Sequence, residues 1–114
     1  MEYSCVLCNI RNGDVPSDFV YSDEMFFVIR DINPAAPTHL LIIPQKHVTE
    51  LSGLKNLSRD SFMDMLGVAN HVAEKEGILE SGYRLVINQG QNSGQEVEHL
   101  HMHVLGGQRL GNIG

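Results

Sequence analysis

Three histidines at alternate positions constrain the fold of this chain more than any other feature of its sequence. They are His99, His101 and His103, and single apolar residues separate them. Successive side chains of a β-strand point to opposite faces, so the pattern predicts a strand over residues 97–105 with the three imidazoles on one face. A solvent-exposed face has no reason to prefer histidine to lysine, threonine or glutamate. We therefore interpret these histidines as functional, and the apolar residues between them as part of the core.

Two kinds of chemistry suit aligned imidazoles. Two histidines two positions apart, roughly 6.6–7 Å between their α-carbons, can bind one metal ion, but three in a line span twice that distance. A neutral imidazole is alternatively a good nucleophile toward phosphorus or acyl centres when its other ring nitrogen is hydrogen-bonded. The turn at residues 93–96 contains Gly94, and backbone N–H groups in such a turn can bind an anion. This turn favours phosphate chemistry, and a metal enzyme that chelators inactivate is the alternative.

The order of the other predicted elements indicates an α+β fold. Strands are predicted at residues 19–21, 25–29, 39–43 and 83–88, a main helix at 58–77 and a short helical turn at 49–57. Strands precede and follow one long helix in the sequence, and β-α-β units do not repeat. This order predicts a mostly antiparallel sheet. The main helix is expected to bury one apolar face, made of Phe62, Met65, Leu66, Ala69, Val72 and Ala73.

Composition restricts the partners and the compartment. The chain has 114 residues, enough for a single domain, and 14 acidic against 8 basic residues give a net charge of −6. Without a basic run, binding to nucleic acid or to an anionic membrane is not expected. No targeting segment is visible, and the longest clean apolar run, residues 40–43, is too short to span a membrane. Cys5 and Cys8 alone cannot build a disulfide framework, so we expect a reducing, cytoplasmic location.

The segment HLHMHVL at residues 99–105 resembles the signature of the histidine triad (HIT) family, in which apolar residues separate three histidines and follow the last one. Gly106 and Gly107 resemble the Hint branch, the nucleoside phosphoramidases, because the dinucleoside polyphosphate hydrolases usually have Pro-Arg there. The resemblance implies a single HIT domain over residues 1–114. Further matches are Ile10, VPS at 15–17, DINP at 31–34, APTH at 36–39, IIP at 42–44, GYR at 82–84 and Asn88.

This resemblance implies a particular fold and reaction. The fold would be a five-stranded antiparallel sheet with one long and one short helix on one side, and two chains would form a homodimer with a ten-stranded sheet. The enzyme would cleave the P–N bond of purine nucleoside 5′-phosphoramidates, of AMP, GMP or aminoacyl-adenylate type, without a required cofactor. The alternatives are a dinucleoside polyphosphate hydrolase or nucleotidyltransferase of the same family, and a nucleotide-binding regulatory protein.

The resemblance also implies the role of each residue in the site. His101 would attack phosphorus to form a nucleotidyl-histidine intermediate, which water would then hydrolyse. His103 and Asn88 would assist around the phosphate, His99 would orient His101, and His39 would join a relay through His99. Asp31 would bind the ribose hydroxyls, although an Asp here also favours a turn, and core packing is the alternative for each apolar residue of the base pocket. The implied nucleotide-binding residues are Asp31, Ile32, Ile10, Ile29, Val6, Leu7, Asn88, Gly94, Gln95 and Glu96, with His101 and His103.

The pair Cys5 and Cys8 is a weak metal signal by itself, and two buried cysteines are the alternative. Some family members bind structural zinc with such a pair and two histidines, and the resemblance assigns His47 and His99 to that role. Zinc would then support the catalytic strand and take no part in the reaction. The sequence departs from many Hint proteins at Glu96, Glu98 and Gln108, which affects the side of the site where the amine leaves.

Overall fold

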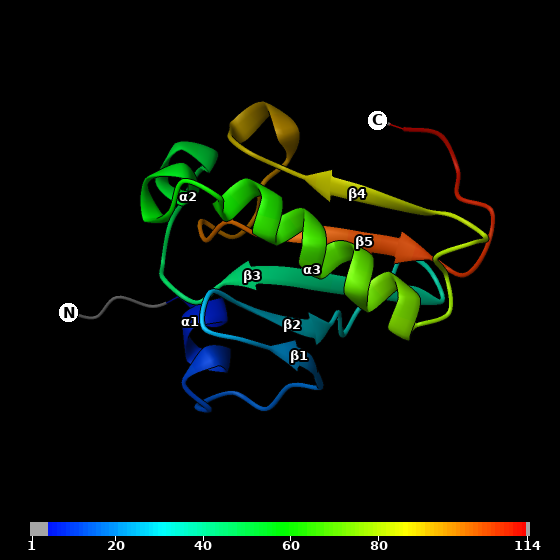
Figure 1. Cartoon of the computed structure of the whole chain (residues 1–114), viewed down its shortest axis with the longest axis horizontal. Coiled ribbons are helices and arrows are strands. Elements are labelled where there is room, and N and C mark those ends of the chain that lie inside the picture. Colours follow the sequence, from blue (N-terminus) through cyan, green and yellow to red (C-terminus); the bar gives the residue numbers. More distant parts are fainter. Residues whose placement is uncertain (1–4, 114) are drawn as a thin grey trace.

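The computed structural model describes residues 5–113 and is built on one antiparallel sheet with helices packed against it (Figure 1). The helices are α1 (Val6–Arg11), α2 (Leu51–Leu57) and α3 (Ser61–Lys75), and a 3₁₀ turn, η1, spans Gln91–Ser93. The strands are β1 (Phe19–Ser22), β2 (Phe26–Arg30), β3 (Thr38–Pro44), β4 (Tyr83–Ile87) and β5 (Met102–Gly106). Within the described residues, no helix is long and apolar enough to cross a membrane.

The five strands form a single sheet in the order β1-β2-β3-β5-β4, and every neighbouring pair is antiparallel. β3 is the central strand and is almost entirely buried, as expected for an apolar run covered on both faces. Its register places Leu41 opposite His103 of β5. The α+β, five-stranded antiparallel fold is thereby confirmed. The strands at 19–21, 25–29, 39–43 and 83–88 lie within one residue of their predicted bounds.

Helices α2 and α3 pack on one face of the sheet, where the larger of the two buried apolar clusters lies (Figure 1). Leu54 of α2 and Val72 of α3 are fully buried there. The apolar residues between and after the histidines, Leu100, Met102 and Val104, belong to the same core. The prediction that the apolar residues between the histidines are part of the core is therefore confirmed.

Helix α3 ends just before a glycine, within the predicted helix, but the face that it buries differs from the predicted one. Gly77 has a φ of +78°, and the N–H of Ile78 donates to the carbonyl of Ala73 at 3.0 Å. This pairing terminates helices at a left-handed glycine. Phe62 and Leu66, which were expected in the core, are 42% and 53% exposed. The core-facing side of the helix is rotated away from them, and they form an apolar surface instead.

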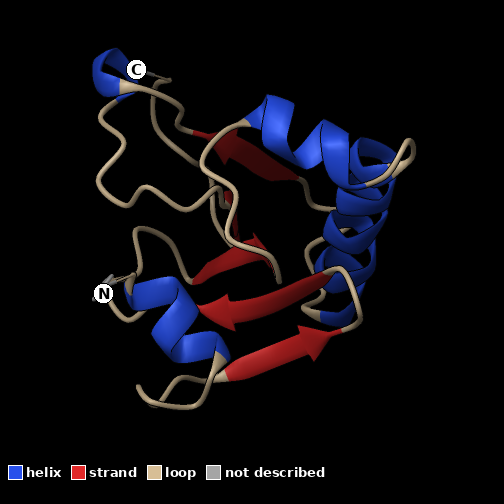
Figure 2. Ribbon diagram, turned by 90° about the vertical axis from the view of Figure 1, so that its left-hand side faces the viewer, coloured by secondary structure: helices blue, strands red, loops and turns tan. Residues whose placement is uncertain are grey.

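Helix α1 covers the opposite face of the sheet, so the expectation of helices on one side only is wrong (Figure 2). Leu7 and Ile10 of α1 pack with Phe27, Ile29 and Ile43 in a second buried cluster. A helix of six residues has too few turns to produce a clear periodic pattern, which is why the sequence did not indicate it. The sheet therefore lies between two helical layers, α2 with α3 on one side and α1 on the other.

Strand β5 is shorter than predicted and begins only at residue 102. Residues 97–101 leave the sheet, and the N–H of Leu100 donates to the carbonyl of Val48 at 2.7 Å, beyond the end of β3. His99 is fully buried, and Nδ1 of its side chain contacts Cys5, Cys8 and His47, which lie outside the sheet. The prediction that the three imidazoles share one strand face is therefore wrong. Only His103 lies in β5, and His99 belongs to a separate constellation.

Candidate active site

A pocket of about 310 Å³ gathers most of the residues that the sequence implied in catalysis and phosphate binding. Two residues that line it, Leu41 and Val97, were not predicted. Strand alternation could have identified Leu41, because it lies two positions after His39 on the same face of β3. The pocket residues are Leu7, Asp31, Leu41, Asn88, Gly94, Gln95, Glu96, Val97, His101 and His103.

His101 offers an unprotonated ring nitrogen to this pocket. Its Nδ1–H donates to the backbone carbonyl of His99 at 2.8 Å. A neutral imidazole carries one ring proton, so a proton on Nδ1 leaves the lone pair on Nε2. This is the state in which imidazole acts as a nucleophile. Because His101 lines the pocket, its Nε2 is the atom available to a bound substrate.

A chain of hydrogen bonds fixes the tautomers of His39 and His103. The backbone N–H of Ala35 donates to Nδ1 of His39 at 3.0 Å, which assigns the ring proton to Nε2. That Nε2–H donates to Nδ1 of His103 at 2.9 Å, so His103 carries its own proton on Nε2 and serves the pocket as a donor. The predicted relay from His39 through His99 is wrong. His39 and His103 meet because they lie on the same face of the neighbouring strands β3 and β5.

Burial keeps both of these imidazoles neutral near pH 7. The pKa of His103 is lowered to about 4, first by burial and then by the nearby rings of His101 and His39. Burial also lowers the pKa of His39, against the opposing effect of Asp31, whose Oδ2 lies 3.5 Å from Nε2. A neutral ring donates from one nitrogen and accepts at the other. The depressed pKa values therefore preserve the directions of the hydrogen bonds in the relay.

The loop of residues 90–97 is held in place by its own side chains. Gly94 has a φ of +81°, a left-handed conformation that glycine adopts without strain. The side chain of Gln95 accepts from the N–H of Gly90 at 2.8 Å and donates to the carbonyl of Val97 at 3.0 Å. The loop lines the pocket with Gly94, Gln95, Glu96 and Val97. The N–H groups of Ser93 and Gly94 already donate to carbonyls of the loop, so backbone donors to an anion would have to come from residues 95–97.

A second constellation, here called the Cys/His cluster, joins Cys5, Cys8, His47 and His99. Nδ1 of His99 lies 3.4 Å from the sulfur of Cys5, 3.5 Å from that of Cys8 and 3.2 Å from Nδ1 of His47. The sulfur of Cys8 lies 3.3 Å from Nδ1 of His47. The cluster brings together three segments: the start of α1, the loop after β3 and the irregular segment before β5.

The donor atoms of the Cys/His cluster fit a tetrahedral zinc ion. Usual bond lengths place sulfur and nitrogen ligands about 3.5 Å apart and two nitrogen ligands about 3.3 Å apart, close to the distances above. The Nε2–H of His99 donates to the carbonyl of Pro44 at 3.0 Å, which leaves the lone pair on the nitrogen that faces the cluster. Burial lowers the pKa of His99 to about 4, so the ring is neutral, as a metal ligand must be.

Asp31, His39 and His103 also bring three donor atoms together, but their hydrogen bonds favour a relay over a metal site. To bind an ion through Nε2, His39 would have to carry its proton on Nδ1. The N–H of Ala35 already donates to that nitrogen. Two donors would then face each other, so the neutral relay is the more stable arrangement.

Several residues implied in base binding lie outside the pocket. Ile10 and Ile29 are buried in the core beneath α1. Val6 lines a neighbouring cavity, and Ile32 is 85% exposed at the surface. Their contact with a base stays a prediction.

Backbone groups that control the histidines were not among the predicted site residues. The N–H of Ala35 and the carbonyl of Pro44 fix the tautomers of His39 and His99. Every residue except proline has both an N–H and a carbonyl, so no residue type marks those that will perform this function. Only the three-dimensional arrangement identifies them.

Known proteins resemble this chain over almost its whole length. The HIT domain family model matches residues 12–110. The chain is 42% identical over 111 residues to the purine nucleoside phosphoramidase of Escherichia coli (strain K12), covering 97% of this chain and 93% of that protein. A histidine triad protein from Clostridium difficile has a TM-score of 0.89 at 38% identity, with all of both chains covered. A zinc-bound histidine triad family protein from Mycobacterium smegmatis has a TM-score of 0.76 at 35% identity, covering 90% of this chain and 73% of that one.

These matches agree with the site geometry in two respects. Two of the three signature histidines, His101 and His103, line the pocket, and the fold around them superposes on a solved member of the family. The matched region, residues 12–110, includes both the pocket loop and the relay. The chain therefore belongs to the HIT domain family and is a hydrolase of that family.

Proposed function

We propose that the enzyme hydrolyses the P–N bond of purine nucleoside 5′-phosphoramidates. The observation that carries this proposal is the state of His101, whose Nε2 lone pair belongs to a pocket lined by the glycine-containing loop of residues 94–97. Asp31 lies in the same pocket, where its carboxylate would accept hydrogen bonds from the ribose hydroxyls. The name of the E. coli relative, a purine nucleoside phosphoramidase, supports the same substrate class.

The reaction follows from these positions in two steps. Nε2 of His101 attacks phosphorus, the P–N bond breaks, and the amine departs with a proton taken from water. The carbonyl of His99 accepts from Nδ1–H and so stabilises the positive charge that the ring gains on forming the P–N bond. The Nε2–H of His103, Asn88 and the loop N–H groups would stabilise the phosphoryl oxygens. The hydroxide that remains from this water then attacks phosphorus, and the bond to Nε2 breaks with its electron pair returning to the ring. The nucleoside monophosphate is released and His101 is neutral again.

We further propose that the Cys/His cluster holds a structural zinc ion. The fit of its four donor atoms supports this assignment, as does the zinc-bound relative from M. smegmatis. Zinc supplies a cross-link between segments there, and no reaction step requires it. Thiolate ligands need a reducing environment, which is consistent with a cytoplasmic enzyme.

The proposal includes a homodimer in which each chain forms one domain over residues 1–114. β4 is an edge strand with one side paired to β5, so its other side is available to a second copy. The exposed apolar residues Phe62 and Leu66 of α3 provide further surface for that copy. A continuous ten-stranded sheet would then result from pairing of two β4 strands.

Single-turnover hydrolysis of adenosine 5′-phosphoramidate by the zinc-loaded protein tests the proposed reaction. The wild type should release AMP and form a nucleotidylated protein that mass spectrometry detects on rapid quenching. His101→Ala should lose activity by on the order of 10³-fold or more and form no adduct. The control is His71→Ala, because His71 lies on α3, where its ring contacts that of Tyr21 away from the pocket. Undiminished activity in His101→Ala, or cleavage of diadenosine polyphosphates in preference to the phosphoramidate, would contradict the proposal.

A further inference from the structure

We infer that metal binding at the Cys/His cluster sets the position and the tautomer of His101, so that metal occupancy controls the nucleophile. This inference rests on the proposed function, because it concerns the readiness of the same site. The metal would not approach the substrate. It would act through His99, which is a positioning residue. The side chain of His99 belongs to the cluster, and its backbone carbonyl accepts the hydrogen bond from His101.

The first argument is that His99 belongs to both constellations. Its side chain contributes Nδ1 to the cluster, within 3.5 Å of both sulfurs and of Nδ1 of His47. Its backbone carbonyl accepts from Nδ1–H of His101 at 2.8 Å. A ligand that fixes the side chain therefore also fixes the acceptor that keeps the proton of His101 on Nδ1 and the lone pair on Nε2.

The second argument is the lack of sheet support for this segment. His99 and His101 both lie before the first residue of β5, so no strand ladder holds them. The segment is connected to the rest of the fold by the Leu100 N–H to the Val48 carbonyl and by the His99 ring to the Pro44 carbonyl. Both anchors reach the loop after β3 or its last residue. A metal shared with His47, in the same loop, would strengthen this attachment considerably.

The third argument is that the cluster also attaches α1. Cys5 is the N-cap of this helix and Cys8 lies in its first turn. Leu7, between them, lines the catalytic pocket. A metal ion bound by both sulfurs and by His99 would therefore link one wall of the pocket directly to the segment that carries the nucleophile.

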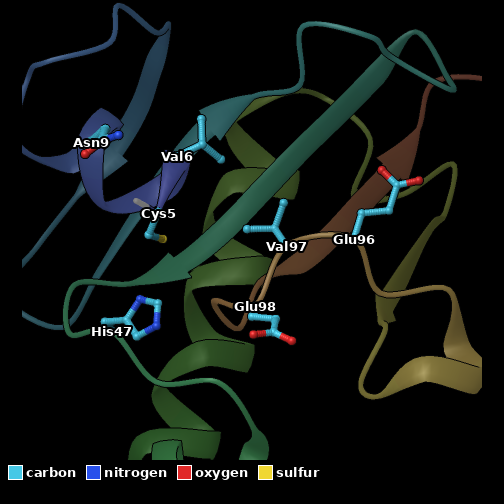
Figure 3. Close-up of a pocket in the computed structure, with 7 residues that line it drawn as sticks. All are labelled: Cys5, Val6, Asn9, His47, Glu96, Val97 and Glu98. Carbon is cyan, nitrogen blue, oxygen red and sulfur yellow. The ribbon is translucent and has the colours of Figure 1, made fainter. Parts of the chain in front are cut away.

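The fourth argument is that the cluster can exchange its metal with solvent. A cavity of about 530 Å³ reaches Cys5 and His47, and Figure 3 shows both side chains at one side of it. His47 is exposed, and the carboxylates of Glu96 and Glu98 belong to the same cavity. A divalent cation thus has a route to the cluster past groups of opposite charge. A metal site that exchanges its ion with solvent can regulate activity through its occupancy, whereas a site closed to solvent can only stabilise the fold.

The experiment compares the zinc-loaded wild type with the apo wild type and with His47→Gln, which removes the most exposed ligand. The full-length chain is labelled with ¹⁵N-histidine, and the ring nitrogens of His101 are read by NMR at fixed pH. Zinc should give a single tautomer with the proton on Nδ1, and its loss should give a mixture. Amide exchange over residues 97–101 should become at least about 10-fold faster without zinc, and kcat should fall about 10- to 100-fold. His71→Gln, with an equivalent change far from the cluster, should behave as the wild type.

Amide exchange in β2 and β3 reports whether the core is intact in each form. If the core is intact and the tautomer and exchange rates of the His101 segment do not depend on zinc, the inference is overturned. If zinc changes the tautomer and exchange but no form cleaves the phosphoramidate, the coupling holds and the proposed function fails. If His47→Gln unfolds, the apo wild type decides between the same two results.

Discussion

At the scale of single residues, backbone groups decide what each histidine can do. The four histidines of the triad and relay differ little in chemistry, yet three backbone partners give them different roles. The carbonyl of Pro44 directs His99 to the cluster, the carbonyl of His99 makes His101 a nucleophile, and the N–H of Ala35 makes His39 a donor. A change of one partner would exchange donor for acceptor without moving the ring.

The relay through His39 gives a prediction at this scale. His39→Leu removes the donor to Nδ1 of His103, so that the proton on Nε2 of His103 is no longer fixed, and kcat should fall about 10- to 100-fold with little change in KM. His39→Gln keeps an N–H donor and should recover most of kcat. Steady-state kinetics on both variants, with melting temperatures, separates positioning from folding. Equal loss of kcat in both variants, or a drop that follows the melting temperature, would count against the relay.

The sequence predicted the residues of the pocket better than their connections. Asp31, Asn88, His101 and His103 gather around one pocket as the resemblance implied. The resemblance gave His99 as the partner of His39, whereas the structure pairs His39 with His103. Contacts between segments depend on register and on where a strand ends, and neither is marked by residue type.

At the scale of elements, the junction between β3 and β5 depends on Gly107. Its φ is +93°, and a Cβ at this position would lie 2.9 Å from Cβ of Pro37 and 3.3 Å from the backbone nitrogen of Thr38. Thr38 opens β3, and its register partner is the last residue of β5. The close approach therefore fixes the end of the strand that carries His103 against the start of the strand that carries His39.

A substitution of Gly107 should lower the free energy of unfolding by more than backbone strain alone would. Gly107→Ala should lower the free energy of unfolding by about 2–4 kcal/mol, because it combines an unfavourable φ with a clash. Gly13→Ala is the matched control: its φ is +86°, but nothing lies within 4 Å of the added Cβ, so about 1 kcal/mol is expected. Urea denaturation of both variants measures the difference, and equal destabilisation would show that packing at Gly107 contributes nothing.

Elements with a strong local signal were predicted and those without one were missed. Four strands were found almost to the residue, and the main helix was predicted over residues 58–77, which include all of α3. Helix α1 was missed because six residues are too few for a period, and β5 was extended too far toward the N-terminus. The alternation of residues 99–103 is genuine in the sequence. It reflects separate partners for His99 and His103, and not one continuous strand.

At the scale of the whole molecule, β4 and the adjacent face of α3 give a prediction about assembly. Leu66→Glu places a charge in the exposed apolar surface and should shift the proposed dimer toward monomer, with dissociation favoured by 10-fold or more at equal concentration. Met63→Glu is the matched control, because Met63 is 72% exposed on the same helix but lies in a groove with Tyr21 and Met25 of the opposite edge. Light scattering across a dilution series compares the two variants. A wild type that is monomeric at every concentration would disprove the dimer.

The two buried clusters on opposite faces of the sheet have a consequence for how such a chain can change. Along β3 and β5, one residue contacts the layer of α2 and α3, and the next contacts the face that holds the pocket and α1. Stability and chemistry are thus assigned to alternate positions of the same strands. Substitutions at the positions that face the pocket can change substrate specificity, while the positions that face α2 and α3 keep the fold stable. Directed evolution toward new leaving groups should accumulate tolerated substitutions with a period of two along these strands.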